Sequence, residues 1–289
     1  MKKTLAMCIR CKDDPDCLKE NIEYHTLMGV EHFFIYDHVS TIPLKSVLVD
    51  YDNVTVELVL TDQEMLSCYR KCYKENKDNF QWIAFMDTDE FIVMKNGNTD
   101  LKEFLKPYIT YGGLSIWWRT FGSSGHLNKQ PSVIRGFTSA SSKGGPSFKT
   151  ICNTNQGFVD HFPTNAGFSH EPRWKPDAFS VFDDFSRVRD AGIHSHARYP
   201  PIDMNNQKIQ INHYIIRSYE DFKEKIDRNA KHNLAHSNMM SVPIKKSDPP
   251  RTEYWTHFDE VGYSGEGMEE DISIHKLIEL IAKKRSNLV

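Results

Sequence analysis

The sequence predicts an α/β protein built on a doubly wound, mostly parallel β-sheet. Two observations support this class. Apolar runs typical of buried strands recur early in the chain, at 4–10, 31–37, 54–60 and 82–87. Segments with helical patterns separate these runs, and strands that alternate with helices form parallel sheets through right-handed crossovers. Ligands of such sheets bind at the carboxyl ends of the strands.

The first crossover is predicted to be a helix that starts at Asp14 and stops at Gly29. Asp14 suits the N-cap position, Pro15 suits the first turn, and Gly29 suits the left-handed conformation that ends many helices. The apolar face of this helix repeats at helical spacing and consists of Leu18, Ile22, His25 and Met28.

Two further helices connect the remaining early strands. A short helix is expected at 44–49, and Thr61 with Glu64 forms a capping box for a longer one. The apolar face of the longer helix consists of Met65, Leu66, Tyr69, Cys72 and Tyr73. The strand at 82–87 then completes the alternating pattern.

The pattern changes after residue 100. Residues 120–208 are rich in Gly, Ser, Asn, Pro and His and have weak periodicity, and loops of this length are usually functional or mobile. Ser218 and Asp221 can cap a helix that runs to about Lys231. The other elements expected here are a helix at 101–108, strands at 113–121 and 209–218, and a final amphipathic helix with Ile274, Leu277, Ile278 and Ile281 on one face.

Composition excludes several classes of protein. The 289 residues carry a formal net charge of −3 and no long basic run, which argues against a nucleic-acid partner. No stretch approaches the roughly 20 apolar residues that span a bilayer. The start, MKKTLAMCIR, is basic and then apolar like a signal peptide, but its apolar part is short and charge returns at Arg10. We therefore expect a first strand there and a cytoplasmic protein.

The six cysteines favour the same compartment. Cys8 and Cys11 form a C-x-x-C pair that could indicate zinc or redox chemistry, but no second pair accompanies it. Cys8 falls in a predicted strand, and Cys68 and Cys72 fall on a predicted helix. Reduced, mostly buried thiols in a reducing compartment are the better interpretation.

Acidic residues directly follow the buried strand at 82–87. Asp87 and Asp89 form a D-x-D motif, and Glu90 comes next. Either these carboxylates lie harmlessly at a solvated strand end, or they hold Mg²⁺ or Mn²⁺, which take carboxylate oxygens and leave positions open for phosphate. The ends of the earlier strands carry Arg10, Lys12 and Asp37. A nucleotide diphosphate with a metal ion requires such a mixture of cations and anions.

A phosphatase is an alternative interpretation of the same motif. Haloacid-dehalogenase-type phosphatases also place D-x-D after a strand, and FDDF (182–185) could supply their distal acidic pair. In those enzymes, however, the motif follows the first strand, and Thr or Val lies two positions after the second Asp. Here the motif follows the fourth strand and Phe91 holds that position.

Four blocks occur in the order seen in a known family: ENIEYHTLMGVEHFFIYDHVST, WIAFMDTDEF, WWRTFGSSGH and INHYIIRSYEDFKEK. Over roughly residues 5–230 the chain resembles glycosyltransferase family 92 and the related family-2-like enzymes. One departure is Lys12-Asp13-Asp14, where relatives usually have Asn-Glu after the lysine. The resemblance implies a GT-A fold with an acceptor-side extension, a UDP-sugar donor, a glycan or other hydroxyl acceptor, and Mn²⁺ or Mg²⁺.

The resemblance also implies a division of the chain and roles for the motif residues. Residues 1–110 would form the nucleotide-sugar-binding half of one GT-A domain, 111–235 the acceptor-side half, and 236–289 a C-terminal linker and helix. Asp89 would bind the metal directly, Asp87 would lie near the metal or the ribose of the donor, and His213 would be a third metal ligand. For His213, a hydrogen-bonded core histidine is the alternative. Asp37 would face the uridine or ribose, and the cations expected near the phosphates are Arg10, Lys12, Arg217 and Lys225.

Members of this family invert the anomeric centre, so a base must take the proton of the acceptor hydroxyl. We expect that base between 120 and 208, with Glu171 first and Asp160 next; His161 and Asp184 are further candidates. Aromatic faces suit sugars, and the expected sugar contacts are Trp118, Arg119 and His126. A non-catalytic nucleotide- or carbohydrate-binding protein that keeps the fold is a further alternative.

Overall fold

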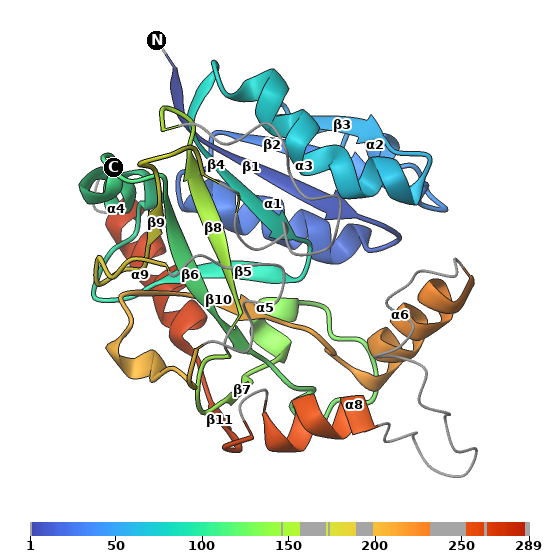
Figure 1. Cartoon of the computed structure of the whole chain (residues 1–289). Coiled ribbons are helices and arrows are strands. Elements are labelled where there is room, and N and C mark those ends of the chain that lie inside the picture. Colours follow the sequence, from blue (N-terminus) through green and yellow to red (C-terminus); the bar gives the residue numbers. More distant parts are fainter. Residues whose placement is uncertain are drawn as a thin grey trace.

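The computed structural model describes residues 2–145, 147–156, 172, 174–188, 199–231, 253–262 and 265–286. In this part of the chain, one nine-stranded mixed sheet has the strand order β3-β2-β1-β4-β8-β6-β10-β5, with β9 paired to β6, and β11 and β7 form a separate pair (Figure 1). The strands are β1 (Lys3–Cys11), β2 (His32–Asp37), β3 (Val54–Leu58), β4 (Phe80–Asp87), β5 (Glu90–Met94), β6 (Gly113–Thr120), β7 (Ser139–Ser141), β8 (Phe148–Asn153), β9 (Ser180–Val181), β10 (Ile209–His213) and β11 (Met268–Glu270).

Helices cover both faces of this sheet. The α-helices are α1 (Pro15–Leu27), α2 (Leu44–Val47), α3 (Asp62–Asn76), α4 (Leu101–Leu105), α5 (Val133–Gly136), α6 (Tyr219–Lys231), α8 (Glu253–Thr256) and α9 (Ser273–Ser286). Short 3-10 helices span Lys106–Tyr108 and Met204–Asn206, and a π-helix spans His257–Val261.

The central strand β1 shows why the sheet is doubly wound. Leu5, Met7 and Ile9 belong to the core that includes the buried face of α1, whereas Ala6 and Cys8 belong to the core that includes α3. Because side chains alternate across a strand, a strand that is apolar at every position must be covered on both faces. The predicted α/β class and mostly parallel sheet are therefore confirmed, with parallel pairing of β1 to β2 and β4, and of β2 to β3.

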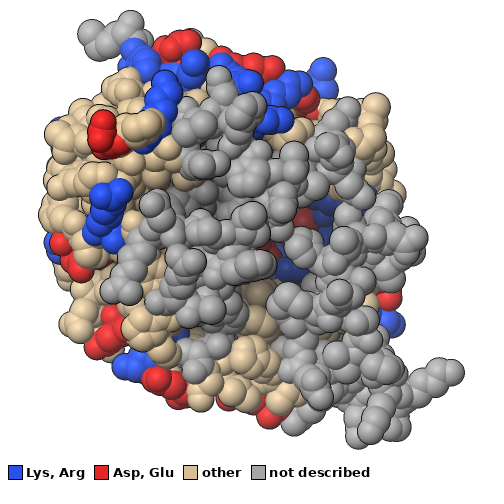
Figure 2. Space-filling view, viewed as in Figure 1, with Lys and Arg blue, Asp and Glu red and all other residues tan. Residues whose placement is uncertain are grey.

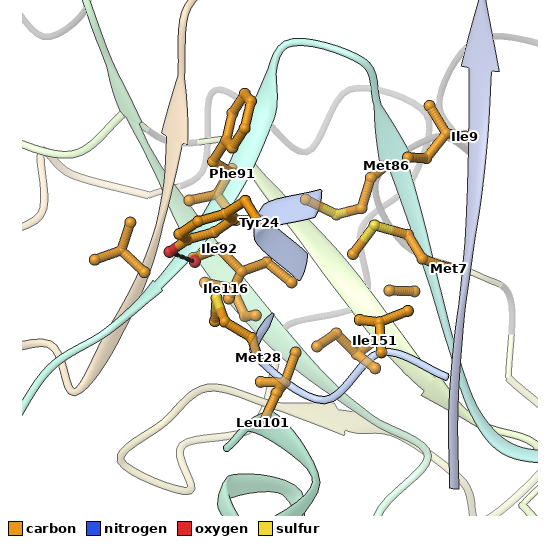
Figure 3. Packing of buried hydrophobic residues seen from close by; sticks show 14 of the residues in the cluster. Met7, Ile9, Tyr24, Met28, Met86, Phe91, Ile92, Leu101, Ile116 and Ile151 are labelled. Carbon is orange, nitrogen blue, oxygen red and sulfur yellow. Dashed lines mark hydrogen bonds between the residues drawn. The ribbon is translucent and has the colours of Figure 1, made fainter. Parts of the chain in front are cut away.

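The larger core joins the two ends of the chain. Figure 3 shows Met7, Met86 and Ile151 from three neighbouring strands with Tyr24 and Met28 from the α1 region. The Tyr24 hydroxyl donates a 2.7 Å hydrogen bond to the carbonyl oxygen of Ile92, which satisfies the polar end of a buried ring. The C-terminal helix α9 contributes to the same core through Ile274, Leu277 and Ile281.

The strand predicted at 82–87 is followed closely by a second strand that was not predicted. β4 ends at Asp87, Thr88 and Asp89 form a turn, and β5 starts at Glu90 and crosses to the far edge of the sheet beside β10. The acidic residues therefore lie at the turn that connects β4 to β5. The early and late parts of the chain share one sheet, because β5 pairs with β10 and β4 pairs with β8.

Other predicted boundaries differ for identifiable reasons. The strand expected at 209–218 ends at His213, after which the amide of Tyr214 bonds the carbonyl oxygen of Asp89 and Arg217 takes a positive φ of 53°. Asp14 does occupy the N-cap position of α1, but its carboxylate binds Arg217 instead of the helix amides. β8 was not predicted, since the region around it has weak periodicity.

The expected cap of α6 is confirmed. The hydroxyl of Ser218 accepts from the amide of Asp221 at 3.1 Å, and the Asp221 carboxylate accepts from the Ser218 amide at 3.3 Å. For the capping box expected at Thr61, the side chain of Glu64 lies outside the described residues.

All six cysteines are free and buried, as expected. Cys8 and Cys11 contact opposite faces of the sheet, so they cannot converge on one zinc ion. None of the helices within the described ranges has the length and apolar character needed to cross a membrane. On the face drawn in Figure 2, Lys and Arg are interspersed with Asp and Glu.

Candidate functional site

A cavity of about 350 Å³ lies at the carboxyl ends of the central strands. The parallel register aligns these ends, because Arg10 is opposite Asp87 and Cys11 is opposite Asp37. The described residues that line the cavity are Arg10, Lys12, Asp14, Asp87, Thr88, Asp89, His213, Ile215, Arg217, Lys225 and Arg228. Five of them are Lys or Arg and three are Asp, so the cavity has a net positive charge and attracts anions.

Asp87 is held by cations on both carboxylate oxygens. Its Oδ1 accepts from Arg10 at 2.8 Å and from the Tyr69 hydroxyl at 3.2 Å, and its Oδ2 accepts from Lys149 Nζ at 2.7 Å. Burial alone would raise the pKa of Asp87, but Lys149 and Arg10 hold it well below its usual range. The Arg10 guanidinium also lies 4.5 Å from the centre of the Tyr69 ring.

Asp89 is close to two groups from the C-terminal side of the cavity. Its Oδ2 lies 3.1 Å from Lys225 Nζ on α6, and its Oδ1 lies 3.6 Å from Nε2 of His213 at the end of β10. Burial alone would raise the pKa of Asp89. Lys225 and, to a smaller extent, His213 lower this pKa by more than burial raises it, so the net shift is downward. Burial lowers the pKa of His213 to about 4, so the imidazole is neutral at physiological pH.

A hard divalent cation fits this donor set in part. Among the described residues, no group of three or more His, Cys, Asp or Glu side chains is arranged to hold a metal ion. Asp89 Oδ1 and His213 Nε2, however, are 3.6 Å apart, which is less than twice a metal–ligand distance of about 2.1 Å. A neutral imidazole and a carboxylate can therefore contact one cation, and Mg²⁺-type sites often take their other ligands from phosphate and water.

Two cations hold the loop that follows β1: Arg217, which lies between β10 and α6, and Arg228, which lies on α6. Arg217 binds Asp14 at 2.9 Å, and Arg228 donates to the carbonyl oxygens of Lys12 and Asp13 at 2.8 and 3.0 Å. Asp13 has a positive φ of 49°, which is uncommon for a residue other than glycine. The cavity is thus closed on one side by contacts between segments about 200 residues apart in sequence.

Comparison with known proteins identifies the family. The family model for glycosyltransferase family 92 matches residues 3–258. The chain belongs to that family. A family 92 protein of Oryza sativa subsp. japonica is 29% identical over 143 residues, covering 47% of this chain and 24% of the relative. One of Ricinus communis is 25% identical over 236 residues, covering 78% of this chain and 37% of the relative.

These figures mean that the family 92 chain spans well under half the length of the curated relatives it matches. Two solved structures are similar at lower levels. Glucosyl-3-phosphoglycerate synthase from Mycobacterium tuberculosis, solved with Mn²⁺ and UDP, has a TM-score of 0.28 and 12% identity, over 40% of this chain and 44% of that chain. The 4-diphosphocytidyl-2C-methyl-D-erythritol synthase of Anaerococcus prevotii has a TM-score of 0.29 and 11% identity, over 98% and 96%.

Family 92 membership removes the phosphatase alternative, and the geometry agrees. The second acidic pair, Asp183 and Asp184, is not among the residues that line the cavity. Asp183 is buried and accepts from the amide of Lys208, while Asp184 accepts from Ser186 at 2.8 Å. Asp87, which would be the nucleophile, is already bound by Arg10 and Lys149.

The structure brings most of the predicted donor-side residues together in this cavity: Arg10, Lys12, Asp87, Asp89, His213, Arg217 and Lys225. Asp37 is the exception. It lies at the end of β2 but is 2% exposed, and its carboxylate accepts from the amides of Ser40 and Leu44. Asp37 therefore holds the loop after β2 in place and has little surface for a nucleotide.

None of the three predicted sugar contacts is among the described residues that line the cavity. Arg119 is 4% exposed, points to the opposite side of β6 from Trp118, and binds Asp271 at 2.6 Å and Glu269. His126 bonds the carbonyl oxygen of Gly136 at 3.0 Å. Trp118 packs against a residue of the lining, since the centre of its ring lies 4.3 Å from that of His213.

The two predicted bases, Glu171 and Asp160, lie outside the described residues, as does the third candidate His161. The fourth, Asp184, is described and is not part of the cavity. The role of Glu171 and Asp160 thus stays a prediction.

Sequence reasoning missed Lys149, Tyr69 and Arg228 as site residues. Lys149 is 1% exposed and stands in FKTIC, where a lysine within an apolar strand was the available signal. Arg228 lies three positions after Lys225 on the same helix, and residues at that spacing share a face. Tyr69 was assigned to the apolar face of its helix, and its hydroxyl could not be placed without the tertiary fold.

Proposed function

We propose that this family 92 protein is a metal-dependent, inverting glycosyltransferase that moves a sugar from a UDP-linked donor to a hydroxyl group of a glycan or similar acceptor. One observation supports this most directly: a cavity rich in Lys and Arg contains Asp89 beside a neutral His213. The cations suit a diphosphate, and the Asp–His pair suits a hard cation bound to that diphosphate.

The reaction breaks the bond between the anomeric carbon and the diphosphate. Negative charge then grows on the leaving oxygen, and preorganised cations stabilise such charge because they need not reorganise during the step. Lys12, Arg217 and Lys225 line the cavity and are the side chains that we assign to this role. A divalent ion, when bound by Asp89 and His213, supplies further Lewis-acid stabilisation of the leaving group.

Inversion also requires a group that accepts the proton of the attacking hydroxyl on the face opposite the leaving group. Glu171 is our first assignment and Asp160 the second, both from the segment expected to shape the acceptor site. The ring of Trp118, which contacts His213, can cover the apolar face of a hexose beside the metal site.

Stabilisation by nucleotide tests this proposal. A ligand at 100 times its Kd stabilises the folded state by about 2.7 kcal/mol, which for a chain of this size raises the melting temperature by about 5 °C. We expect UDP with Mn²⁺ to give such a shift, and ADP, GDP or Mn²⁺ alone to give much less.

Asp89→Asn should lose the part of the shift that depends on Mn²⁺, and Asp50→Asn, an exposed carboxylate outside the cavity, should behave like the wild type. Equal shifts with and without Mn²⁺, or no shift with any nucleotide, would contradict the proposal. Mn²⁺-dependent release of UDP from a UDP-sugar would then separate an enzyme from a non-catalytic binding protein.

A further inference from the structure

Lys149 is a buried lysine at the base of the cavity with no assigned role. It lies on β8, between β4 and β6 in the sheet, and is 1% exposed (Figure 1). Its Nζ is 2.7 Å from Asp87 Oδ2, 3.5 Å from Glu90 Oε2 and 5.8 Å from the centre of the Trp118 ring. A buried ammonium is tolerated only when anionic or polar partners surround it.

The partners of Lys149 limit what Asp87 can bind. Arg10 and Tyr69 already contact Oδ1 of Asp87, and Lys149 contacts Oδ2. Glu90 fixes the backbone below, since its Oε2 accepts from the Asp87 amide at 2.9 Å. The charge of Asp87 is therefore offset by two cations, and one of them is held in the protein interior, where solvent screens it little.

The charges around the cavity also disfavour a divalent cation that binds without a diphosphate. The described lining contains five cations against three carboxylates, and beneath Asp87 the buried Lys149 adds a sixth cation and Glu90 a fourth carboxylate, so the cations remain in excess. A divalent cation that enters alone meets a net positive field, whereas a diphosphate is attracted and brings the negative charge that the cation needs.

We propose that Lys149 is a positioning residue whose ammonium fixes the Asp87 carboxylate and makes divalent-cation binding depend on the diphosphate of the donor. The inference deepens the proposed function and rests on it for the identity of the ligands. Asp87 then serves as an oriented hydrogen-bond acceptor, while the cation is left to Asp89, His213 and the diphosphate.

Titration of Mn²⁺, followed by its electron paramagnetic resonance signal with and without UDP, tests this inference. The wild-type protein should bind Mn²⁺ at least tenfold more tightly when UDP is present. Lys149→Met should bind Mn²⁺ alone roughly tenfold more tightly than the wild type, because one unit of repulsion is removed and Asp87 is released. In the same variant, UDP should enhance Mn²⁺ binding less, and UDP alone should bind more weakly.

Three variants control for other effects. Lys149→Arg keeps the charge and should restore wild-type behaviour. Lys149→Gln removes the charge but can still donate to Asp87, so it repeats the test if Lys149→Met does not fold. Lys95→Met removes a partly buried lysine that bonds the carbonyl oxygen of Met204 away from the cavity, and Mn²⁺ affinity should not change.

The outcomes separate the two proposals. A purely structural role would lower the melting temperature and weaken Mn²⁺ and UDP binding together, with no tightening of Mn²⁺ in either uncharged variant, and would overturn the inference. UDP-dependent Mn²⁺ binding in the wild type would still uphold the proposed function in that case. If the wild type binds no Mn²⁺ even with UDP, the proposed metal-dependent donor site fails, and the inference, which rests on it, fails with it.

Discussion

Asp89→Ala should reduce the turnover of a UDP-sugar by about a thousandfold. Metal-bound charge stabilisation at a leaving group is worth several kcal/mol, and roughly 4 kcal/mol corresponds to this factor. The substitution removes the only carboxylate next to His213 among the described cavity residues and leaves Lys225 without its 3.1 Å partner. The measurement is the rate of UDP release from UDP-sugars with Mn²⁺.

Asp50→Ala is the control for this experiment, because Asp50 is exposed and lies outside the cavity. The folded state of both variants should be compared by circular dichroism. An Asp89→Ala protein that keeps its fold and retains activity within threefold of the wild type would show that Asp89 is not part of the reaction site.

The largest effect on stability is expected from Asp271→Ala. Asp271 and Arg119 form an ion pair in which both side chains are 5% exposed, at 2.6 Å. The Asp271 carboxylate also accepts from Gln210 at 2.8 Å and from the Ser273 amide at the start of α9 at 2.8 Å. Without Asp271, the buried Arg119 keeps only the half-exposed Glu269 as an anionic partner, and the free energy of unfolding should fall by about 3 kcal/mol.

Urea unfolding at pH 7 measures this loss, and Glu270→Ala, an exposed neighbour, should change the free energy of unfolding by less than about 0.5 kcal/mol. Burial would raise the pKa of Asp271, but Arg119 lowers it below its ordinary value of 3.8. The ionised Asp271 therefore contributes its full stabilisation at a pH well above 3.8, and this contribution is lost as the pH falls below 3.8. The difference in free energy of unfolding between the wild type and Asp271→Ala should accordingly be smaller at pH 3 than at pH 7.

A substitution of Arg119 distinguishes a structural role of this residue from a role in substrate binding. Arg119→Met should destabilise the protein and leave the Kd for UDP unchanged, since the guanidinium ties β6 to Glu269 and Asp271. If Arg119→Met instead keeps full stability and weakens donor or acceptor binding, Arg119 is a substrate contact and the structural role assigned to it is wrong.

Local patterns were sufficient to predict the parts of the site that lie close together in sequence. An apolar strand followed by Asp87 and Asp89 places both carboxylates at a strand end, and the capping pattern at Ser218 fixes the start of the helix that carries Lys225. The resemblance to family 92 enzymes added His213, which the structure places 3.6 Å from Asp89.

Contacts that depend on strand order could not be predicted in this way. Lys149 reaches Asp87 only because β8 inserts antiparallel between β4 and β6, in a region without clear periodicity. Arg119 illustrates a different limit. It follows Trp118 on one strand, so the two side chains must face opposite sides, but the pattern does not say which side faces the cavity.

The location of the metal ion tests the central claim most directly. Crystals grown with UDP and Mn²⁺ should show an anomalous scattering peak within about 2.3 Å of both Asp89 and His213, in contact with the diphosphate and outside the coordination distance of Asp87. UDP bound in this cavity without any such peak, or a Mn²⁺ ion at a different place in the protein, would contradict a metal-assisted donor site.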